Sequence, residues 1–465
     1  MKIRILTLLS CLFCVAQLSA QQFFYGADLS YVNEMEDCGV QYRENGTARD
    51  VYDIFADHHF NLVRLRLWHT PAWYDTLNAG KRYADLADVR KAILRAKAAN
   101  MKVLLDFHLS DTWADPQKQV APAAWSGVLG NLPLLQDSLR NYITATLQHL
   151  HQDNLLPDMV QIGNETNRGI LLSEAQNNAG WQLDWPRNSA LFKTAIEAVR
   201  TVSAQSGKDI KIALHLAGPA DTEWLVQGFW NNGVQDFDVI GMSYYWAWHQ
   251  PTTIAQCGNV IAALKNKYPG KAIMVFETGY IWTTQANDAA NNIISATHPD
   301  YAPASPQNQR KWLTDLSEVV QSSGGAGVIY WEPAWQSSPC FTPWGQGSHQ
   351  EHATFFDFSN NVLPDGGMFW PASQSSAAPE AGLKSSVELL GARAGTRQVV
   401  LKFSDTPVPQ EQVELRLFDL NGRQVASGQM PFQEQLPWQL PDVPAGAYFL
   451  QIKIGLWTSY KSLRL

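Results

Sequence analysis

The 465-residue sequence is poor in charge and contains no run of basic side chains. Only 17% of its residues are charged, and 35 Lys and Arg stand against 43 Asp and Glu, for a net charge of −8. A nucleic-acid partner would need a basic surface and is therefore not expected. After residue 20 no apolar stretch reaches the roughly 20 residues that a membrane-spanning helix needs. The hydrophobic fraction of 45% is that of a globular protein, which excludes disorder as the main state.

Cysteine is also scarce, at five residues. Two of them lie in an N-terminal segment with a basic start, a short apolar run and a small residue at Ala20, the pattern of a secretory signal peptide. We therefore expect residues 1–20 to be removed and the protein to be secreted from a bacterium or displayed on its surface. The other three have no metal-ligand spacing and fit either one disulfide with a free thiol or three buried thiols: Cys38, Cys257 and Cys340.

Short apolar runs alternate with amphipathic helical stretches along most of the chain. The runs cover residues 23–28, 62–68, 103–108, 159–165, 211–216, 239–245, 272–277 and 327–332. Helical stretches include residues 134–150, 190–203, 221–230, 254–267 and 309–322, and one that Asp85 can cap. This alternation predicts an α/β fold, a (β/α)8 TIM barrel over residues 21–370. A doubly wound open sheet is the alternative, but no glycine-rich phosphate turn follows the first run.

The amino-acid composition and the hydrophobic pattern of the sequence change after residue 370. Small residues and prolines predict a linker over residues 371–384. Alternating segments at 399–403, 413–418, 423–427, 448–454 and 459–465 then predict a small all-β domain over residues 385–465.

Polar side chains gather at the C-terminal ends of the predicted barrel strands, where the active site of such a barrel lies. They are Asp28, Trp68, His108, Asn164, Glu165, Tyr244, Tyr245, Glu277, Trp331 and Glu332. Glu165 and Glu277 end the fourth and seventh runs, so they should face each other across one pocket. Glycoside hydrolysis needs such a pair, one as general acid/base and one as nucleophile. For either residue alone, helix capping or pairing with an arginine is the alternative.

The 18 tryptophans either fill the core or form platforms for sugar rings. Trp230 and Trp312 fall in helices and are expected to be packing residues. Five others fall in loops at the barrel mouth and favour sugar stacking: Trp113, Trp246, Trp248, Trp335 and Trp344.

Several segments resemble the family 53 endo-β-1,4-galactanases, within the clan of retaining (β/α)8 glycosidases. They are GADLS (26–30), EDCGVQY (36–42), VRLRLW (63–68), LDFHLSDTWADP (105–116), QIGNE (161–165), GMSYY (241–245), FET (276–278) and YWEP (330–333). The resemblance implies Glu165 as acid/base and Glu277 as nucleophile, with retention of configuration. It implies cleavage of galactan or arabinogalactan, with no required cofactor. The substrate-binding set would be Asp28, Arg66, His108, Asp111, Trp113, Asn164, Tyr244, Tyr245 and Trp331.

Four points stay open at this level. Helix capping is the alternative for Asp111, and Glu332 is expected to form a structural pair. Some family members hold a structural calcium ion between the last two mouth loops; here Asn287 and Asp288 offer oxygen ligands, but the spaced acidic series is missing. A retaining β-mannanase or β-glucanase, or a non-catalytic glycan-binding surface protein, is the alternative function.

The C-terminal segment resembles the type A sorting domains of the type IX secretion system. The matching stretches are LRLFDLNGRQV (415–425) and LPDVPAGAYFLQI (440–452), whereas the end, YKSLRL, departs from the usual lysine-rich close. The resemblance implies that the protein engages outer-membrane secretion machinery; a generic accessory β-sandwich is the alternative. We expect the protein to be a monomer.

Overall fold

A computed structural model describes residues 22–180, 183–374, 387–392, 398–403, 412–419, 423–433, 435–454 and 457–464. The expected signal peptide lies outside these residues, as does most of the expected linker. Residues Pro371–Gln374, at the start of that linker, form a 3-10 turn.

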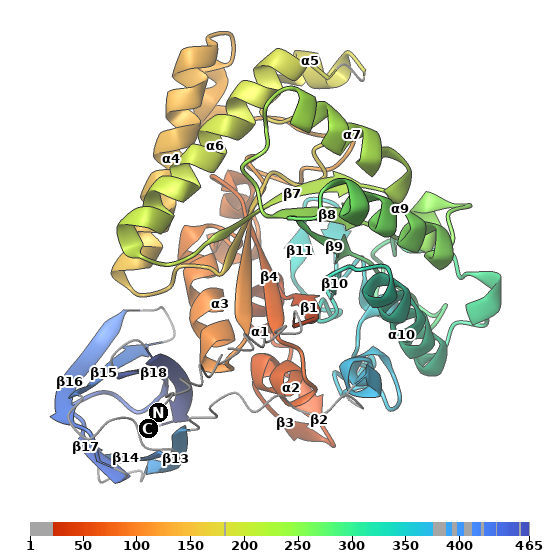
Figure 1. Cartoon of the computed structure of the whole chain (residues 1–465). Helices are drawn as coiled ribbons and strands as arrows, with labels where there is room; N and C mark the ends of the chain where they lie inside the picture. Colours follow the sequence, from red (N-terminus) through yellow and green to blue (C-terminus); the bar gives the residue numbers. More distant parts are fainter. Residues whose placement is uncertain are drawn as a thin grey trace, which may run out of the picture.

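Eight parallel strands close into a barrel (Figure 1). They are β1 (Phe24–Asp28), β4 (Leu62–Leu67), β5 (Lys102–Phe107), β6 (Met159–Ile162), β7 (Lys211–Ala217), β8 (Val239–Ser243), β9 (Ala272–Glu277) and β10 (Gly327–Tyr330). The barrel is closed because β1 pairs in parallel with both β4 and β10. The barrel prediction is thus confirmed, and the open-sheet alternative is wrong.

Helices surround the barrel between successive strands. They are α2 (Val51–Asp57), α3 (Leu86–Ala98), α4 (Leu132–Gln152), α6 (Trp185–Ser206), α7 (Pro219–Asn231), α9 (Ile254–Lys267) and α10 (Pro306–Ser322). The Asp85 carboxylate accepts a hydrogen bond from the amide of Asp88 at 2.9 Å and so caps α3, as expected. Val89, Ile93 and Ala96 are buried on the inner face of that helix.

The strands divide the interior into two regions because successive side chains point to opposite faces. On β4, Val63, Leu65 and Leu67 face the helices and belong to the large outer core. Leu62 points inward and joins an apolar layer that closes the barrel floor. Arg64 and Arg66 share its parity and are buried above that floor. The barrel is therefore apolar at its base and charged toward the mouth.

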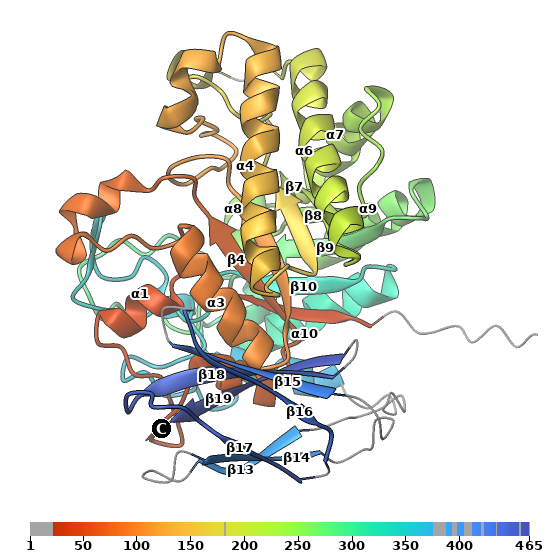
Figure 2. The same cartoon turned by 90° about the vertical axis from the view of Figure 1, so that its left-hand side faces the viewer.

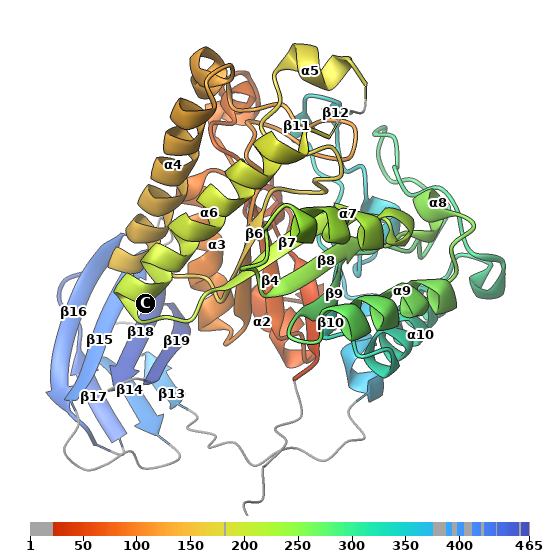
Figure 3. The same ribbon diagram turned by 45° about the horizontal axis from the view of Figure 1, so that its top comes forward.

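Short elements lie in the connections between the barrel strands and helices and in the segment after β10 (Figure 3). They are α1 (Val32–Asp37), β2 (Arg43–Glu44), β3 (Thr47–Ala48), α5 (Glu174–Asn178), α8 (Trp246–His249), β11 (Phe341–Thr342), β12 (Gly345–Gln346) and 3-10 turns at Ala72–Thr76, Asn78–Gly80, Ala123–Val128, Pro299–Tyr301, Glu351–Ala353 and Gly367–Phe369. A disulfide joins Cys38, after α1, to Cys340, after β10. Cys257 is a buried free thiol, so the first of the two cysteine interpretations holds.

The C-terminal strands form a small all-β domain beside the barrel (Figure 2). One sheet holds β13 (Val387–Ala392), β14 (Gln398–Phe403) and β17 (Gln435–Gln439); the other holds β15 (Gln412–Asp419), β16 (Gln424–Pro431), β18 (Ala447–Ile454) and β19 (Trp457–Arg464). Strands β18 and β19 lie against α3, and Phe418 and Phe449 join the apolar core of the barrel domain. Within the described ranges, no helix combines the length and hydropathy needed to span a membrane.

Removing the disulfide should destabilise the protein measurably. The bond joins residues 302 positions apart, and closing so long a loop restricts the unfolded chain. We expect Cys38→Ala/Cys340→Ala to lower the free energy of unfolding by about 2–5 kcal/mol in urea titrations. Reductant should lower the stability of the wild type and of the Cys257→Ala control equally and leave the double variant unchanged. A double variant as stable as the wild type would contradict this.

Candidate active site

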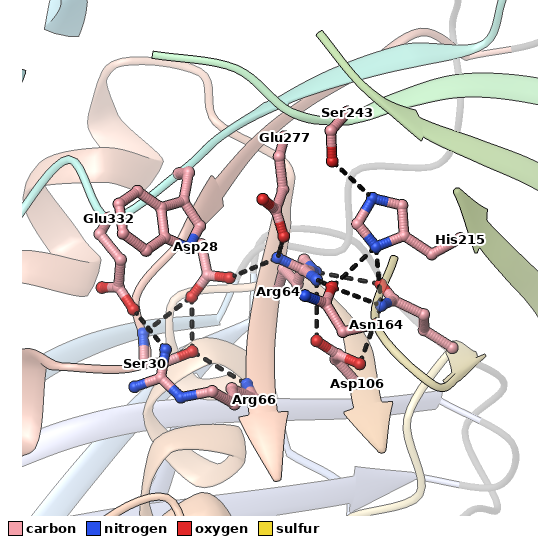
Figure 4. A network of polar contacts seen from close by, with 12 residues as sticks. Asp28, Ser30, Arg64, Arg66, Asp106, Asn164, His215, Ser243, Glu277 and Glu332 are labelled. Carbon is pink, nitrogen blue, oxygen red and sulfur yellow. Dashed lines mark hydrogen bonds and ion pairs between the residues drawn. The ribbon is translucent and has the colours of Figure 1, made fainter. Parts of the chain in front are cut away.

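The side chain of Arg64 occupies the centre of the barrel and uses all five of its N–H groups (Figure 4). Nη1 donates to Asp28 Oδ2 at 2.9 Å and to Glu277 Oε1 at 2.7 Å. Nη2 donates to Asp106 Oδ2 at 2.8 Å and to Asn164 Oδ1 at 2.7 Å. Nε donates to Gln161 Oε1 at 3.1 Å. One cation therefore positions five groups from four strands or their ends: β1, β5, β6 and β9.

The nucleophile candidate, Glu277, ends β9 and is 6% exposed. Its second oxygen accepts a hydrogen bond from the Tyr245 hydroxyl at 3.1 Å. Burial raises the pKa of Glu277, and the Arg64 guanidinium opposes that rise, while Asp28 and Asp106 add to it. With one oxygen on Arg64 and the other on Tyr245, the carboxylate is held by donors at both ends.

The acid/base candidate, Glu165, follows β6 in a tight turn. Gly163 and Glu165 have φ angles of +73° and +47°, and a Cβ on Gly163 would come within 2.5 Å of the Thr166 side chain. The amide of Gln119 donates to the carbonyls of Asn164 and Glu165 at 2.7 and 3.2 Å and so fastens the turn. A left-handed glutamate costs backbone strain, which these contacts offset.

The two carboxyl groups have different surroundings. Desolvation raises the pKa of Glu165 well above its usual value, and the nearby carboxylates of Glu277 and Asp115 raise it further. The guanidinium of Arg64 contacts Glu277 directly but makes no hydrogen bond to Glu165. The pair is thus arranged with Glu165 as the better proton donor and Glu277 as the better-supported carboxylate, the division that acid and nucleophile require.

A cavity of about 390 Å³ opens above these two glutamates. Asn164, Glu165, Tyr245 and Glu277 line it together with five tryptophans: Trp113, Trp248, Trp331, Trp335 and Trp344. Trp248 and Trp344 are each 49% exposed at the rim. Trp246 instead packs on His298, with ring centroids 4.2 Å apart, and does not line the cavity. Trp312 is fully buried and Trp230 packs against the core, as expected.

Arg66 supports the aromatic wall rather than the glutamate pair. Its Nη1 donates to Glu332 Oε1 at 3.0 Å, so Glu332 is part of a buried ion pair. The guanidinium lies 4.0 Å from the ring centroid of Trp113 and 4.7 Å from that of Tyr31. Tyr31 in turn stacks on Trp335 at 4.0 Å. The pair therefore fixes two tryptophan walls from behind.

The remaining expected site residues divide into buried supports and loop residues. Asp28 holds Arg64, and His108 lies 3.1 Å from Asp106, both beneath the cavity. Burial lowers the pKa of His108, although Asp106 opposes this. Asp111 accepts hydrogen bonds from the amides of Thr70 and Ala123 and so braces two loops. The hydroxyl of Tyr244 donates to Thr252 O at 2.7 Å. Neither Asp111 nor Tyr244 lines the cavity.

The residues near Asp288 do not fit a calcium ion. Asp288 accepts hydrogen bonds from the amides of Ala290 and Ser348, both at 2.8 Å. Glu351 accepts from the amide of Asn287 and from the Ser337 hydroxyl. Calcium needs six to eight oxygen ligands, whereas the carboxylate oxygens here already hold the two loops together. In the part of the chain that the structure describes, no group of three His, Cys, Asp or Glu side chains could hold a metal ion.

Sequence reasoning missed several supports of the site: Arg64, Gln119, Gln161, His215 and Ser243. Four of them lie on barrel strands and point inward, and Arg64 and Gln161 stand two residues before Arg66 and Gly163. Strand parity could therefore have revealed them, but parity alone does not say that Arg64 rather than Arg66 reaches Glu277. Gln119 lies in a loop and carries no sequence signal.

A closed (β/α)8 barrel with glutamates at the ends of β6 and β9 that line one cavity, a cationic centre and tryptophan walls defines a glycoside hydrolase of the retaining barrel class. Comparisons with known proteins identify the family within this class. The model of glycosyl hydrolase family 53 matches residues 24–369. The chain belongs to glycosyl hydrolase family 53.

Related proteins and solved structures support this family assignment. The arabinogalactan endo-beta-1,4-galactanase of Cellvibrio japonicus is 46% identical over 362 residues, which cover 77% of this chain and 93% of that protein. The endo-beta-1,4-galactanase of Bacillus subtilis is 34% identical and covers 84% and 85%. The GH53 catalytic domain of Ignisphaera aggregans superposes with a TM-score of 0.67 at 34% identity, over 75% of this chain and 95% of that one.

The raised pKa of Glu165 predicts a pH-dependent cost to stability. A carboxyl group whose pKa is higher in the folded than in the unfolded state favours folding at low pH and loses that contribution as the pH rises through the folded pKa. We expect Glu165→Gln to unfold with the wild-type free energy near pH 4 and to be more stable by about 1 kcal/mol or more near pH 8, because each pKa unit is worth about 1.4 kcal/mol.

Urea titrations across this pH range measure the difference. Glu197→Gln, on the exposed face of α6, is the control and should follow the wild type at every pH. A constant gap between Glu165→Gln and the wild type from pH 4 to pH 8 would contradict the assignment.

Proposed function

We propose that this protein is an endo-β-1,4-galactanase that cleaves galactan or arabinogalactan by double displacement. The observation that carries the proposal is the pair Glu165 and Glu277 at the base of a tryptophan-lined cavity, in a chain 46% identical to a protein named as such an enzyme. Tryptophan faces suit the apolar faces of pyranose rings.

In the first half of the reaction Glu277 attacks the anomeric carbon, and the bond to the glycosidic oxygen breaks. Glu165 gives its proton to that oxygen, so the leaving chain departs as a neutral alcohol. Arg64 and Tyr245 hold Glu277 in the attacking position through its two oxygens. The product of this half is a galactosyl ester of Glu277.

In the second half a water molecule takes the place of the departed chain. Glu165, now ionised, accepts a proton from this water as the oxygen attacks the anomeric carbon. The ester bond breaks, Glu277 regains its charge on Arg64, and Glu165 is protonated again. Two inversions give net retention of configuration. The reaction uses side chains only and requires no cofactor.

Replacing either glutamate should abolish most activity. We expect Glu165→Ala and Glu277→Ala each to lower kcat/KM on linear galactan by at least about 10³-fold, which corresponds to about 4 kcal/mol of transition-state stabilisation. The exposed Glu197→Ala is the matched control and should retain wild-type activity. Reducing-end assays and product sizing measure both rate and endo action. Activity within tenfold of wild type for either active-site variant would refute the mechanism, and products from mannan or glucan alone would refute the substrate.

We further propose that the protein is exported as a monomer, with residues 1–20 as its signal peptide and the C-terminal β domain as a type IX sorting element. The Cys38–Cys340 disulfide supports export, because such bonds persist in oxidising compartments. The β-strand content of the C-terminal domain also suits a sorting domain of this kind.

Export predicts a processed N-terminus. We expect the extracellular protein to begin at Gln21 when it is sequenced from the culture medium or cell surface, because Ala20 supplies the small residue before the cut. Replacing Leu8 by Asp, which interrupts the apolar run, should keep the protein inside the cell. An unprocessed chain that begins at Met1 outside the cell would contradict the signal-peptide assignment.

A further inference from the structure

Asn164, His215 and Ser243 form a continuous chain of polar contacts (Figure 4). Its last member, Ser243, contacts Glu165. Asn164 Oδ1 lies 2.8 Å from Nδ1 of His215, which comes from β7 and is completely buried. The other ring nitrogen, Nε2, lies 3.0 Å from Oγ of Ser243, at the end of β8. Oγ of Ser243 is also 2.5 Å from Oε1 of Glu165. The double-displacement steps above assign no task to His215 or Ser243.

The partners of Asn164 fix where His215 carries its proton. Arg64 donates to Asn164 Oδ1 at 2.7 Å, and Asn164 Nδ2 donates to Ala114 O at 2.8 Å, so the amide has one orientation. Oδ1 only accepts hydrogen bonds, and its 2.8 Å contact with His215 therefore requires a hydrogen on Nδ1. The backbone N–H of Glu165 also faces Nδ1, but at the longer distance of 3.4 Å. The amide of Gln161, 3.1 Å from Nδ1, directs its hydrogens to Asp106 Oδ1 and Gly163 O instead.

His215 is the neutral tautomer. Burial lowers its pKa well below the ordinary value, and the charges of Arg64 and His108 lower it further. Because the single N–H hydrogen of the ring is on Nδ1, Nε2 has a free lone pair, which faces Ser243. The Ser243 hydroxyl can donate its hydrogen to that lone pair. Its oxygen can then be only the acceptor in the 2.5 Å contact with Glu165, so the carboxyl group of Glu165 must be the donor. This arrangement exists only while Glu165 is a carboxylic acid.

When Glu165 is ionised, the single hydrogen of Ser243 has a better acceptor. A hydroxyl that donates to a carboxylate makes a stronger bond than one that donates to a neutral ring. Ser243 then turns toward Glu165, and Nε2 of His215 is left buried without a donor, which costs free energy. His215 therefore opposes ionisation of Glu165, whereas Ser243 favours it.

We propose that Ser243 and His215 are positioning residues that form a two-way hydrogen-bond switch, with Ser243 donating to His215 while Glu165 is the acid and to Glu165 while it is the base. The inference rests on the proposed function for the assignment of Glu165 as acid/base. The charged groups around Glu165 are Glu277 on β9, Asp115 after β5 and Arg64 on β4; those around His215 are Arg64 and His108. None of them is altered by the substitutions below.

The switch predicts shifts of opposite sign in the alkaline limb of the pH profile of kcat/KM, which reports Glu165 in the free enzyme. Ser243→Ala removes the donor to the carboxylate and should move the limb up by about one pH unit. His215→Asn keeps an N–H toward Asn164 but removes the acceptor at Nε2. It frees Ser243 for Glu165 and should move the limb down by about half a unit.

Two further variants serve as controls. His215→Gln keeps an acceptor near the Nε2 position and should restore the wild-type limb. The double variant Ser243→Ala/His215→Asn should have the limb of Ser243→Ala, because Ser243 is the side chain that joins His215 to the carboxyl group of Glu165. Additive shifts in the double variant, or shifts of the same sign in the two single variants, would overturn the proposal. If His215→Asn does not fold, the pH profiles of Ser243→Thr and Ser243→Ala are compared instead. Only the threonine variant retains a hydroxyl and should keep the wild-type alkaline limb.

A carboxyl carbon-13 NMR titration of the same variants separates this inference from the proposed function. The Glu165 signal, assigned by its loss in Glu165→Gln, reports ionisation without any substrate. A wild type that leaves galactan intact would refute the function, and the same opposite shifts in the titration would still support the switch. Hydrolysis of galactan with no shift in either variant would refute the switch alone.

Discussion

The structure depends on one buried cation. Arg64 meets three carboxylates, Asp28, Asp106 and Glu277, at 2.7–2.9 Å, and its own side chain is only 1% exposed. Burying a charge in this way costs several kcal/mol unless it is paired with good geometry, and a guanidinium can satisfy several acceptors at once because its five N–H groups are fixed in a plane. The same bonds that neutralise the cation place the nucleophile. Stability and chemistry therefore share a single group, and losing it would leave three carboxylates unpaired.

Around this centre the two glutamates are treated differently. Glu277 is the last residue of β9 and is held at both oxygens. Glu165 instead follows a strained turn with a left-handed backbone and has partners that can exchange a hydrogen. This contrast suits the reaction. The nucleophile needs one charged state at the outset, and the acid/base must pass through both of its states in every cycle.

Along the barrel axis, the side chains that stabilise the fold and those that line the cavity lie at different levels. Apolar side chains close the floor of the barrel, the polar layer of Arg64, Asp106 and Gln161 lies above it, and the tryptophan walls stand at the mouth. The Arg66–Glu332 pair supports those walls from behind. The disulfide between Cys38 and Cys340 joins the segment after α1 to the long loop after β10, which carries Trp344. Platform residues on loops are thus tied to rigid parts of the chain.

The sequence by itself determined the barrel, the strands within one to three residues and the two glutamates, because strand–helix alternation and polar residues at strand ends are local patterns. Strand parity could also have shown that Arg64 and Arg66 point inward, since side chains alternate along a strand. Only the tertiary structure decided which arginine meets Glu277, that Tyr245 rather than Tyr244 faces the cavity, and that His215 and Ser243 stand behind Glu165. Those facts depend on the stagger of neighbouring strands and on loop paths. A strand's own residues do not encode which side chain of another strand lies at the same height.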